Sequence, residues 1–376
     1  MPSSFVRVAW QGYAVPFARD PFVTGRGQVG VREGILVTVE LDDGVRGFGE
    51  VAPFNGEGCG LDVAVGALAA GATAVLGAAP RDAWAALRAA ILPAVVRAGL
   101  ETAVADAAAR RAGQPFVAWL ADACGLPVPA LPCRLPVNAL VDASTDARIA
   151  ERAAQAVALG FRAIKVKVGG DPAAAAARVV AAREAVGPGI ELRADANGCW
   201  DFDGGRRFLV GAREAGLAFC EEPVGDAPPG VLAALAGETG VPLAVDESCR
   251  TVEELDRLIA AGAAAAVVVK PAFSGLSEAV AMLLRAQAAG LTAVVTSAIE
   301  TGTGVAMAAH VAALLPPPAP AAGLATLDLL ESSLVEGAPA VAGGELVLTG
   351  RAGLGVRPLE DAVRRYATGR CGEVET

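Results

Sequence analysis

The chain has 376 residues, of which 54% are hydrophobic, so it can bury more than one simple core. Its 41 acidic and 31 basic residues give a formal net charge of −10, and the sequence contains no dense run of Lys or Arg. This charge argues against nucleic acid or an anionic membrane as a partner.

The cysteines and the apolar stretches indicate the compartment. The seven cysteines are scattered without a Cys-x-x-Cys spacing, which predicts reduced thiols in a cytoplasmic protein rather than a disulfide framework or a zinc site. The N-terminus lacks the basic start and the continuous apolar segment of a signal peptide. Two long uncharged stretches, 63–80 and 301–327, are rich in Ala and Gly and are expected to form buried helix and loop rather than a membrane span.

The first part of the chain has the pattern of antiparallel strands. The run GILVTVELDDG, residues 34–44, is rich in β-forming residues and ends in an Asp-Gly turn signal, and GFGEVAPF follows as its expected hairpin partner. Ala-rich helical sequence then fills roughly 62–125. At the other end, residues 331–376 contain a separate strand-like piece, GELVLTG, and this segment is expected to pack back on the N-terminal unit.

From about residue 134, short β-branched runs alternate with helical segments rich in Ala, Leu and Arg. Eight strands in such an alternation indicate a parallel α/β barrel, and an open doubly wound sheet is the weaker alternative. The eight runs are RLPVNALV, AIKVKV, IELRAD, LAFCE, PLAVD, AAVVVK, LTAVVTS and GLATLDL.

Charged residues stand at the ends of five consecutive strands. In a parallel barrel, the C-terminal edge of the strands is the active-site mouth. Strands about 45° apart would place three carboxylates within an arc of about 90° and two lysines about 180° apart. Carboxylates this close raise one another's pKa unless a cation lies between them, and an all-oxygen set suits Mg²⁺ or Mn²⁺. The five residues are Lys167, Asp195, Glu221, Asp246 and Lys270.

Lys165 and Lys167 share one face of the second strand, because side chains two positions apart point the same way. A solvated amphipathic strand would explain the pattern if both lysines faced water. At a barrel mouth, however, two charges about 6.6 Å apart repel by roughly 2.5 kcal/mol at an effective dielectric of about 20. Lys165 is therefore expected to keep Lys167 partly neutral, as a general base near pH 7 must be.

These strand ends resemble the enolase superfamily, in its muconate-lactonizing-enzyme-like branch. The resemblance covers nearly the whole chain and implies an α/β fold, a (β/α)7β TIM-type barrel with an α+β capping domain. It implies a capping domain at 1–100, a catalytic barrel at 101–330, and a C-terminal segment at 331–376 that packs back on the cap. The motifs that carry it are KVK (165–167), RADAN (193–197), CEEP (220–223), VDES (245–248) and VVKP (268–271).

The resemblance also implies roles for the residues at the mouth. Asp195, Glu221 and Asp246 would hold Mg²⁺, with Lys167 and Lys270 on opposite faces of a small carboxylate substrate. Lys167 would remove the proton α to the carboxylate, and Lys270 would stabilise the anion that forms. The carboxylate groups of the substrate would be held at the positions of Arg193, Asn197, Thr296 and Ser297.

Within the branch, three local features resemble the o-succinylbenzoate synthases. They are VREGILV with GFGEVAPF, KPAFSG after the sixth strand, and GLATLDLL at the eighth. Dipeptide epimerases of the branch usually carry an Asp-x-Asp pair on the eighth strand, whereas Leu327-Asp328-Leu329 offers one Asp, which argues against a substrate with a free α-ammonium group. The implied reaction is the Mg²⁺-dependent syn-dehydration of 2-succinyl-6-hydroxy-2,4-cyclohexadiene-1-carboxylate to 2-succinylbenzoate in menaquinone biosynthesis.

Other interpretations stay open. N-acylamino acid racemase is the nearest alternative, followed by another racemase or a cycloisomerase of the branch. A metal-free barrel that forms a Schiff base on Lys167 or Lys270, and a non-catalytic barrel, are more distant. Arg193 has a structural alternative, an ion pair with an inward carboxylate, and Glu222 is expected to support the metal ligands rather than join them. The oligomeric state, including a homo-oligomer, is open as well.

Overall fold

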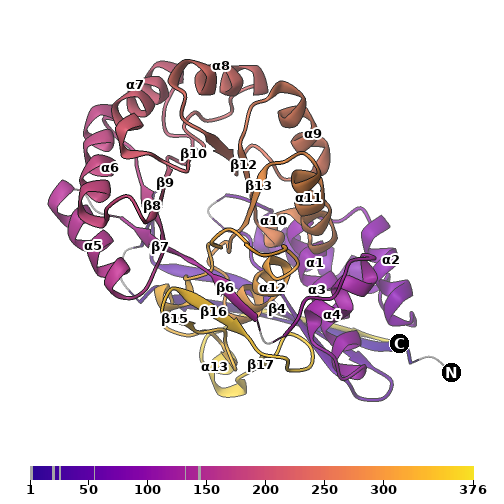
Figure 1. The fold of residues 1–376 in the computed structure, drawn as a ribbon. Coiled ribbons are helices and arrows are strands. Elements are labelled where there is room, and N and C mark those ends of the chain that lie inside the picture. The colour runs from indigo at the N-terminus through magenta and orange to yellow at the C-terminus, as the bar shows by residue number, and fades with distance from the viewer. Residues whose placement is uncertain (1–2, 19–21, 25–26, 55, 132, 143–144) are drawn as a thin grey trace.

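The computed structural model describes residues 3–18, 22–24, 27–54, 56–131, 133–142 and 145–376. A curled sheet of parallel strands is surrounded by helices, and an antiparallel sheet with its own helices lies beside it (Figure 1). The expected α/β class is thus confirmed, as a seven-stranded parallel half-barrel with an antiparallel capping domain.

The parallel sheet contains seven strands, and each is hydrogen-bonded to its neighbours in the chain. Helices on the outside connect the strands, so every strand-helix-strand unit advances the sheet by one position. The strands are covered on both faces, which is why they read as short apolar runs. They are β7 (Asn138–Val141), β8 (Ala163–Lys167), β9 (Glu191–Asp195), β10 (Phe219–Glu221), β11 (Leu243–Val245), β12 (Ala266–Val269) and β13 (Thr292–Val295).

Helices form the outer wall of the half-barrel. Two of them begin with an aspartate that caps a free backbone N–H: Asp171 Oδ1 accepts from Ala174 at 2.9 Å, and Asp201 Oδ1 accepts from Gly204 at 2.8 Å. The helices are α5 (Asp146–Ala158), α6 (Pro172–Val186), α7 (Phe202–Ala212), α8 (Pro229–Thr239), α9 (Val252–Ala261), α10 (Pro271–Ser274), α11 (Leu276–Ala288) and α12 (Gly302–Ala312), with a 3-10 turn, η1 (Arg213–Ala215), after α7.

The prediction of an eighth strand over the run GLATLDL is wrong. Two backbone bridges take its place, since Ala322 pairs with Val137 before β7 and Gly323 pairs with Thr296 after β13. A Cβ atom on Gly323 would lie 2.2 Å from the Thr296 Oγ1, so this close approach requires glycine. The chain then leaves the sheet through a 3-10 turn, η2 (Leu327–Leu329), and packs toward the capping domain.

The capping domain is built on an antiparallel sheet in the order β18-β1-β4-β5. The expected hairpin is confirmed, because β4 and β5 pair across a turn in which Gly44 has a φ of 82°. Helix α3 lies against the sheet so closely that a Cβ on Gly49 would come within 2.0 Å of the Gly99 oxygen. The elements are β1 (Phe5–Pro16), β4 (Val31–Leu41), β5 (Arg46–Val51), β18 (Ala367–Glu375), α1 (Leu61–Ala72), α2 (Pro80–Ala89), α3 (Ala94–Arg111) and α4 (Phe116–Ala123), with a small hairpin of β2 (Phe22–Thr24) and β3 (Gly27–Val29).

The C-terminal segment returns to the cap, where β18 pairs antiparallel with β1. Earlier in the segment β16 pairs with β6, so the run RLPVNALV is divided between β6 and β7. The division into domains at residues 100 and 330 stays a prediction, and α3 runs across the first of these positions. The remaining elements are β6 (Cys133–Pro136), β14 (Val335–Glu336), β15 (Val341–Ala342), β16 (Glu345–Leu348), β17 (Arg357–Pro358) and α13 (Glu360–Arg365).

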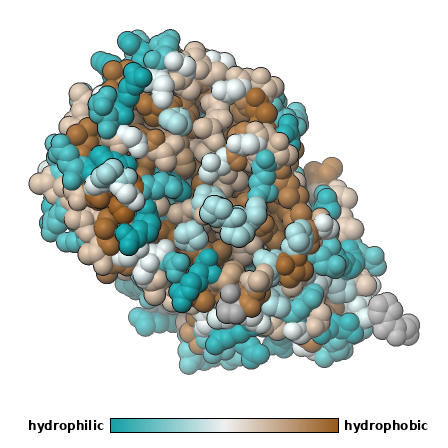
Figure 2. All heavy atoms as spheres, in the orientation of Figure 1, coloured by the Kyte–Doolittle hydropathy of each residue, from teal (hydrophilic) through white to brown (hydrophobic). Residues whose placement is uncertain are grey.

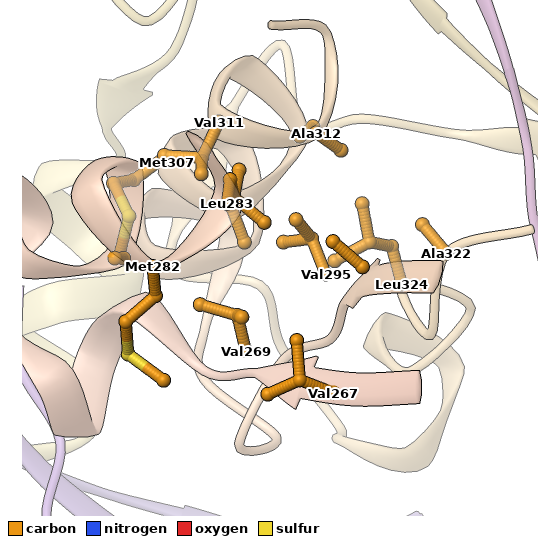
Figure 3. Packing of buried hydrophobic residues seen from close by; sticks show 14 of the residues in the cluster. Val267, Val269, Met282, Leu283, Val295, Met307, Val311, Ala312, Ala322 and Leu324 are labelled. Carbon is orange, nitrogen blue, oxygen red and sulfur yellow. The ribbon is translucent and has the colours of Figure 1, made fainter. Parts of the chain in front are cut away.

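Two apolar layers pack against opposite faces of the parallel strands. On the outside, Val267 and Val269 of β12 lie in one cluster with Leu283 of α11 and Met307 of α12 (Figure 3). On each strand, the residues between those of the outer layer point into the half-barrel, because strand side chains alternate. On the inside, a small separate cluster fills the half-barrel with Phe219, Ala244, Ala266, Val268 and Val294.

The surface mixes polar and apolar residues. Figure 2 shows hydrophilic side chains along the rim of the half-barrel and over the capping domain, with hydrophobic residues between them. Scattered apolar residues of this kind are normal on a folded protein. Within the described part of the chain, no helix is both long enough and apolar enough to cross a membrane.

Candidate active site

In the five neighbouring strands β8 to β12, one side of the strand ends in a charged side chain at the C-terminal edge. In β12, the inner residues Ala266 and Val268 are followed at the same spacing by Lys270. The same two-residue step leads from the inner layer of β10 and β11 to Glu221 and Asp246. These charges therefore stand above the inner apolar cluster, at the mouth predicted from the strand ends.

On one side of the mouth, two lysines of β8 share the carboxylate at the end of β9. The Nζ atoms of Lys167 and Lys165 lie 2.7 Å and 2.9 Å from Asp195 Oδ2. Lys167 also donates to Asn197 Oδ1 at 2.6 Å. Lys165 lies 3.3 Å from both carboxylate oxygens of Glu221. The predicted base, its lysine neighbour and two predicted metal ligands thus form one network.

On the opposite side, Asp246 follows β11 and binds two cations. The Lys270 Nζ lies 2.5 Å from Asp246 Oδ2, and the Arg250 Nη1 lies 2.7 Å from Asp246 Oδ1. Arg250 also pairs with Glu57 of the capping domain. The ring of Phe273 lies beside both cations, with its centroid 5.3 Å from the Arg250 Cζ and 5.9 Å from the Lys270 Nζ. This side of the mouth is therefore tied to the cap.

Charges on the first side control its carboxyl groups. Burial alone would raise the pKa of Asp195, but the ammonium groups of Lys165 and Lys167 hold that pKa below its usual range. Burial and the nearby Asp195 charge raise the pKa of Glu221 well above its usual value. Burial opposes the charge on Lys165, yet Asp195 and Glu221 raise its pKa. Lys165 is therefore a charged neighbour of Lys167, and its effect on the proton affinity of Lys167 stays a prediction.

Asp246 and Lys270 form a second ionised pair. Burial would raise the pKa of Asp246, but the charges of Lys270 and Arg250 hold it low. Burial would lower the pKa of Lys270, and the Asp246 carboxylate instead keeps it above its usual value. Lys270 is therefore held as a positive charge on its side of the mouth.

The donor chemistry of the mouth fits a divalent cation. Asp195, Glu221 and Asp246 are each 1% exposed and offer only oxygen atoms. Burial, followed by the charge of Asp195, raises the pKa of Glu221, and a divalent cation such as Mg²⁺ would favour its ionised form. Among the described residues, no three Asp, Glu, His or Cys side chains stand together as a ready metal site, and Lys165 contacts two of the carboxylates. The ligand set stays a prediction.

A further row of polar contacts orients the strand ends. Glu222 Oε1 accepts from the Asp246 N–H at 2.7 Å, and from the N–H and hydroxyl of Ser248 at 2.9 Å and 2.6 Å. Glu247 Oε1 accepts from Asn197 Nδ2 at 3.0 Å, which links the two sides of the mouth. Glu222 thus supports the chain at the end of β11, and its expected role beside the metal ligands stays a prediction.

Three of the four predicted substrate contacts lie at the mouth. Asn197 belongs to the network of the first side and has a left-handed φ of 45°. Thr296 and Ser297 follow β13, where Thr296 Oγ1 donates to the Gly323 oxygen at 2.9 Å. The Ser297 Oγ lies 2.7 Å from Thr326 Oγ1 on the segment that closes the half-barrel. Their contacts with a substrate stay predictions.

Arg193 is not brought to the mouth. It lies two residues before Asp195, and its Nε is 2.5 Å from Glu191 Oε1 at the start of β9. Its Nη1 donates to the Ala321 oxygen at 2.8 Å and to Asn138 Oδ1 at 3.4 Å. These partners sit at the N-terminal end of the strands, so the geometry favours a structural role for Arg193, in an ion pair with Glu191 and not with a carboxylate of the mouth.

Sequence reasoning missed Arg250 and Glu57. Arg250 stands four residues after Asp246 and two after the VDES motif, so a charge close to a strand end offered a local signal. Glu57 offered none, because it lies 193 residues away from its partner in the chain.

Two family models match the chain. One, described as enolase C-terminal domain-like, covers residues 148–362, and the other, the mandelate racemase / muconate lactonizing enzyme N-terminal domain, covers residues 10–120. The chain belongs to the enolase superfamily. The resemblance seen in five strand-end motifs is therefore confirmed, in the mandelate racemase and muconate-lactonizing-enzyme branch. The superfamily is one of divalent-metal-dependent enzymes, with lyases and isomerases among its members.

Relatives within the superfamily have different activities. The chain is 39% identical to the o-succinylbenzoate synthase of Thermobifida fusca over 206 residues, which are 54% of this chain and 62% of that protein. It is 34% identical to the protein PHYLLO, chloroplastic, of Arabidopsis thaliana over 298 residues, 73% of this chain and 17% of that protein. The match thus spans less than two thirds of either relative.

A solved structure supports the fold over the full length. The dipeptide epimerase from Cytophaga hutchinsonii, complexed with Mg and the dipeptide D-Ala-L-Val, has a TM-score of 0.86 at 25% identity. The superposition covers 100% of this chain and 99% of that one. That relative binds a metal and a small carboxylate ligand on the same fold.

Proposed function

We propose that the protein is an o-succinylbenzoate synthase, which removes water from 2-succinyl-6-hydroxy-2,4-cyclohexadiene-1-carboxylate. The observation that carries the proposal lies in the segment that closes the half-barrel, where branch members that act on dipeptides usually place two aspartates. Here the turn Leu327–Leu329 holds Asp328 alone, and this residue is exposed and has no ion-pair partner among the described residues. The mouth therefore favours a substrate without a free ammonium group. The synthase from Thermobifida fusca supports the same choice.

Lys167 is the best-placed base. Its side chain is 31% exposed, whereas Lys165 and Lys270 are each 13% exposed, so Lys167 is the lysine that a substrate reaches most readily. Mg²⁺ held by Asp195, Glu221 and Asp246 would supply positive charge beside the substrate carboxylate and make its α-proton more acidic. Asn197 Oδ1, which accepts from the Lys167 Nζ at 2.6 Å, orients the base.

The elimination needs one base and no external reductant or oxidant. Lys167 takes the proton α to the carboxylate, and the electron pair of the broken C–H bond passes to the carboxylate-bearing carbon. This pair then forms the new ring double bond as hydroxide leaves from the neighbouring carbon. Lys167 returns its proton to the hydroxide on the same face, so water departs and the ring becomes aromatic. Lys270, paired with Asp246, stabilises the negative charge from the opposite face.

The direct test is turnover by the purified protein. With Mg²⁺ and the cyclohexadiene substrate, we expect the substrate absorbance to disappear and 2-succinylbenzoate to appear by mass spectrometry. A chelator should stop the reaction, and added Mg²⁺ should restore it. Absence of turnover by the wild-type protein with Mg²⁺, or full activity in the chelator, would overturn the proposal. Trapping of substrate by borohydride in the metal-free protein would instead favour a Schiff-base enzyme.

The second candidate is an N-acylamino acid racemase. It is favoured by two lysines on opposite sides of the mouth, since a racemase needs a base on each face of the α-carbon. Incubation of an N-succinyl amino acid in D₂O distinguishes it: a racemase exchanges the α-hydrogen of both enantiomers. A synthase without this activity leaves both enantiomers unlabelled.

A further inference from the structure

The loop that follows β13, residues 296–301, is held in a strained shape. Ile299 has a φ of 60°, a left-handed conformation that β-branched residues rarely adopt. The Ile299 N–H donates to the Ser297 Oγ at 3.4 Å, and that hydroxyl contacts Thr326 Oγ1 at 2.7 Å. The Ser297 hydroxyl is therefore held between the Ile299 backbone and the Thr326 hydroxyl. A strained residue persists only where its surroundings hold it in place.

Arg32 of β4 holds this loop from the capping domain. Its side chain is almost fully buried, and its Nε donates to the Ile299 oxygen at 2.8 Å. A longer contact of 3.5 Å joins its Nη2 to the Ala298 oxygen. The other donors bind cap carbonyls, those of Glu33 at 2.5 Å, Pro53 at 2.8 Å and Ala52 at 2.7 Å.

The use of Arg32 is unusual for a buried cation. A buried charge is costly unless hydrogen bonds satisfy it, and Arg32 forms no ion pair within 4 Å among the described residues. Its planar guanidinium group instead donates to carbonyl groups of both the capping domain and the half-barrel. A lysine ammonium does not reproduce this geometry. Arg32 thereby connects the backbone of the cap with the backbone of the loop 296–301.

Glu50 of β5 holds the other end of the loop. One carboxylate oxygen accepts from the Thr301 N–H at 2.9 Å and from the Tyr13 hydroxyl. The other accepts from the Thr301 hydroxyl at 2.8 Å and from the Gly304 N–H at 2.8 Å. Glu50 thus caps the start of α12 from outside the barrel, where the free N–H groups of a helix favour an anion.

We propose that Arg32 and Glu50 are positioning residues, through which the capping domain sets the loop 296–301 and places the Ser297 hydroxyl for substrate. The path runs from the Arg32 guanidinium through the Ile299 backbone to Ser297. The proposal rests on the proposed function only in taking Ser297 as a substrate contact. The cap then sets substrate fit through the backbone of the barrel, in addition to covering the mouth.

The experiment compares Arg32→Lys with Arg110→Lys. Arg110 is the control, because it also ties the cap to a distant carbonyl, that of Val356 at 2.5 Å, but lies away from the loop and pairs with Asp106 at 2.7 Å. For Arg32→Lys we expect KM for the cyclohexadiene substrate to rise about tenfold or more, since small displacements of a binding group have effects of this size. Amide hydrogen exchange at 299–301 should become faster. Arg110→Lys should lower the melting temperature without changing either quantity.

A second variant covers the case in which Arg32→Lys does not fold. Thr301→Val is nearly isosteric and removes one hydrogen bond to Glu50, so the fold is retained. It should speed amide exchange in 299–301 and raise KM, by less than Arg32→Lys. If both variants change melting temperature but leave KM and loop exchange as Arg110→Lys does, the proposal is wrong. The exchange measurement needs no substrate. It therefore still tests whether Arg32 and Glu50 hold the loop 296–301 if the proposed synthase activity fails.

Discussion

The two sides of the barrel mouth are built in different ways. On the side of β8 and β9, Lys167 is held by Asp195 and Asn197, which follow it closely in the chain. On the side of β11 to β13, the contacts cross to the capping domain. Arg250 joins Asp246 to Glu57, and two hydrogen-bonded pairs, Ile299–Arg32 and Thr301–Glu50, hold the loop after β13.

This difference separates two tasks. The predicted base stands on the side whose described contacts stay within the barrel, so its geometry follows from the register of neighbouring strands. The side tied to the cap carries the fixed charge of Lys270 and the loop with Ser297. We propose that proton transfer by Lys167 belongs to the self-contained side, whereas the side tied to the cap combines the charge of Lys270 with substrate fit at Ser297. Changes at the base should therefore act on kcat, and changes in the contacts to the cap should act on KM and stability.

The largest effect is expected for Lys167→Ala. Removing the base should lower kcat by about 10³-fold or more, because general base catalysis contributes on this scale. Steady-state turnover with Mg²⁺ measures the loss, and circular dichroism and Mn²⁺ binding show whether the fold and the metal site survive. A variant that binds metal normally and turns over at the wild-type rate would remove Lys167 from its assigned role.

Glu300→Gln tests the side tied to the cap. Burial, followed by the charge of Glu50, raises the pKa of Glu300 from 4.5 to about 7. The folded state therefore keeps a proton that the unfolded state releases, and stability falls as the pH rises from 4.5 to about 7. The loss is on the order of 3 kcal/mol above that window.

Glutamine mimics the protonated carboxyl group, so Glu300→Gln should be more stable than wild type at pH 8 and close to it at acidic pH. Urea unfolding at the two pH values measures the difference. Equal pH dependence in both proteins would show that Glu300 does not titrate in this way.

Asn197→Ala addresses the orientation of the base. The variant loses the acceptor at 2.6 Å from the Lys167 Nζ and the link to Glu247. We expect kcat to fall about tenfold, because a misplaced group reduces the rate without removing the chemistry. KM and melting temperature should change little. A large rise in KM with an unchanged kcat would instead mark Asn197 as a substrate contact.

Glu57→Gln should have the smallest effect. Glu57 and Arg250 are both partly exposed, with 21% and 19% of their side chains accessible. Pairs of this kind contribute about 1 kcal/mol or less, so KM should rise by at most about fivefold while kcat stays constant. Kinetics at low and high salt check this, since salt should reduce the difference between variant and wild type. A drop in kcat would connect the cap to the chemical step.

The strand-end residues were predictable because they depend on short-range rules. Alternation of side chains and the order of parallel strands bring Lys167, Asp195, Glu221 and Asp246 to one edge from the local sequence alone. The prediction of an eighth strand failed because the run GLATLDL has strand-like composition, while in the structure only its first residue, Gly323, and the preceding Ala322 form bridges to the neighbouring strands.

The links to the cap were not predictable, because nothing local marks them. Arg32 and Ile299 are 267 residues apart, and Glu50 and Thr301 are 251 residues apart. A buried arginine that binds carbonyl groups has no charged partner that a pattern would show. Arg193 was misleading for a related reason: its motif matches the family, but its side chain turns to Glu191 at the far end of the strand.

The most direct measurement of the division of labour compares Lys167→Arg with Lys270→Arg in the dehydration assay with Mg²⁺. Arginine keeps the positive charge but does not act as a base near neutral pH. The account predicts that Lys270→Arg keeps measurable turnover and that Lys167→Arg has none, with both variants folded. Equal loss in the two variants, or greater activity in Lys167→Arg, would contradict it.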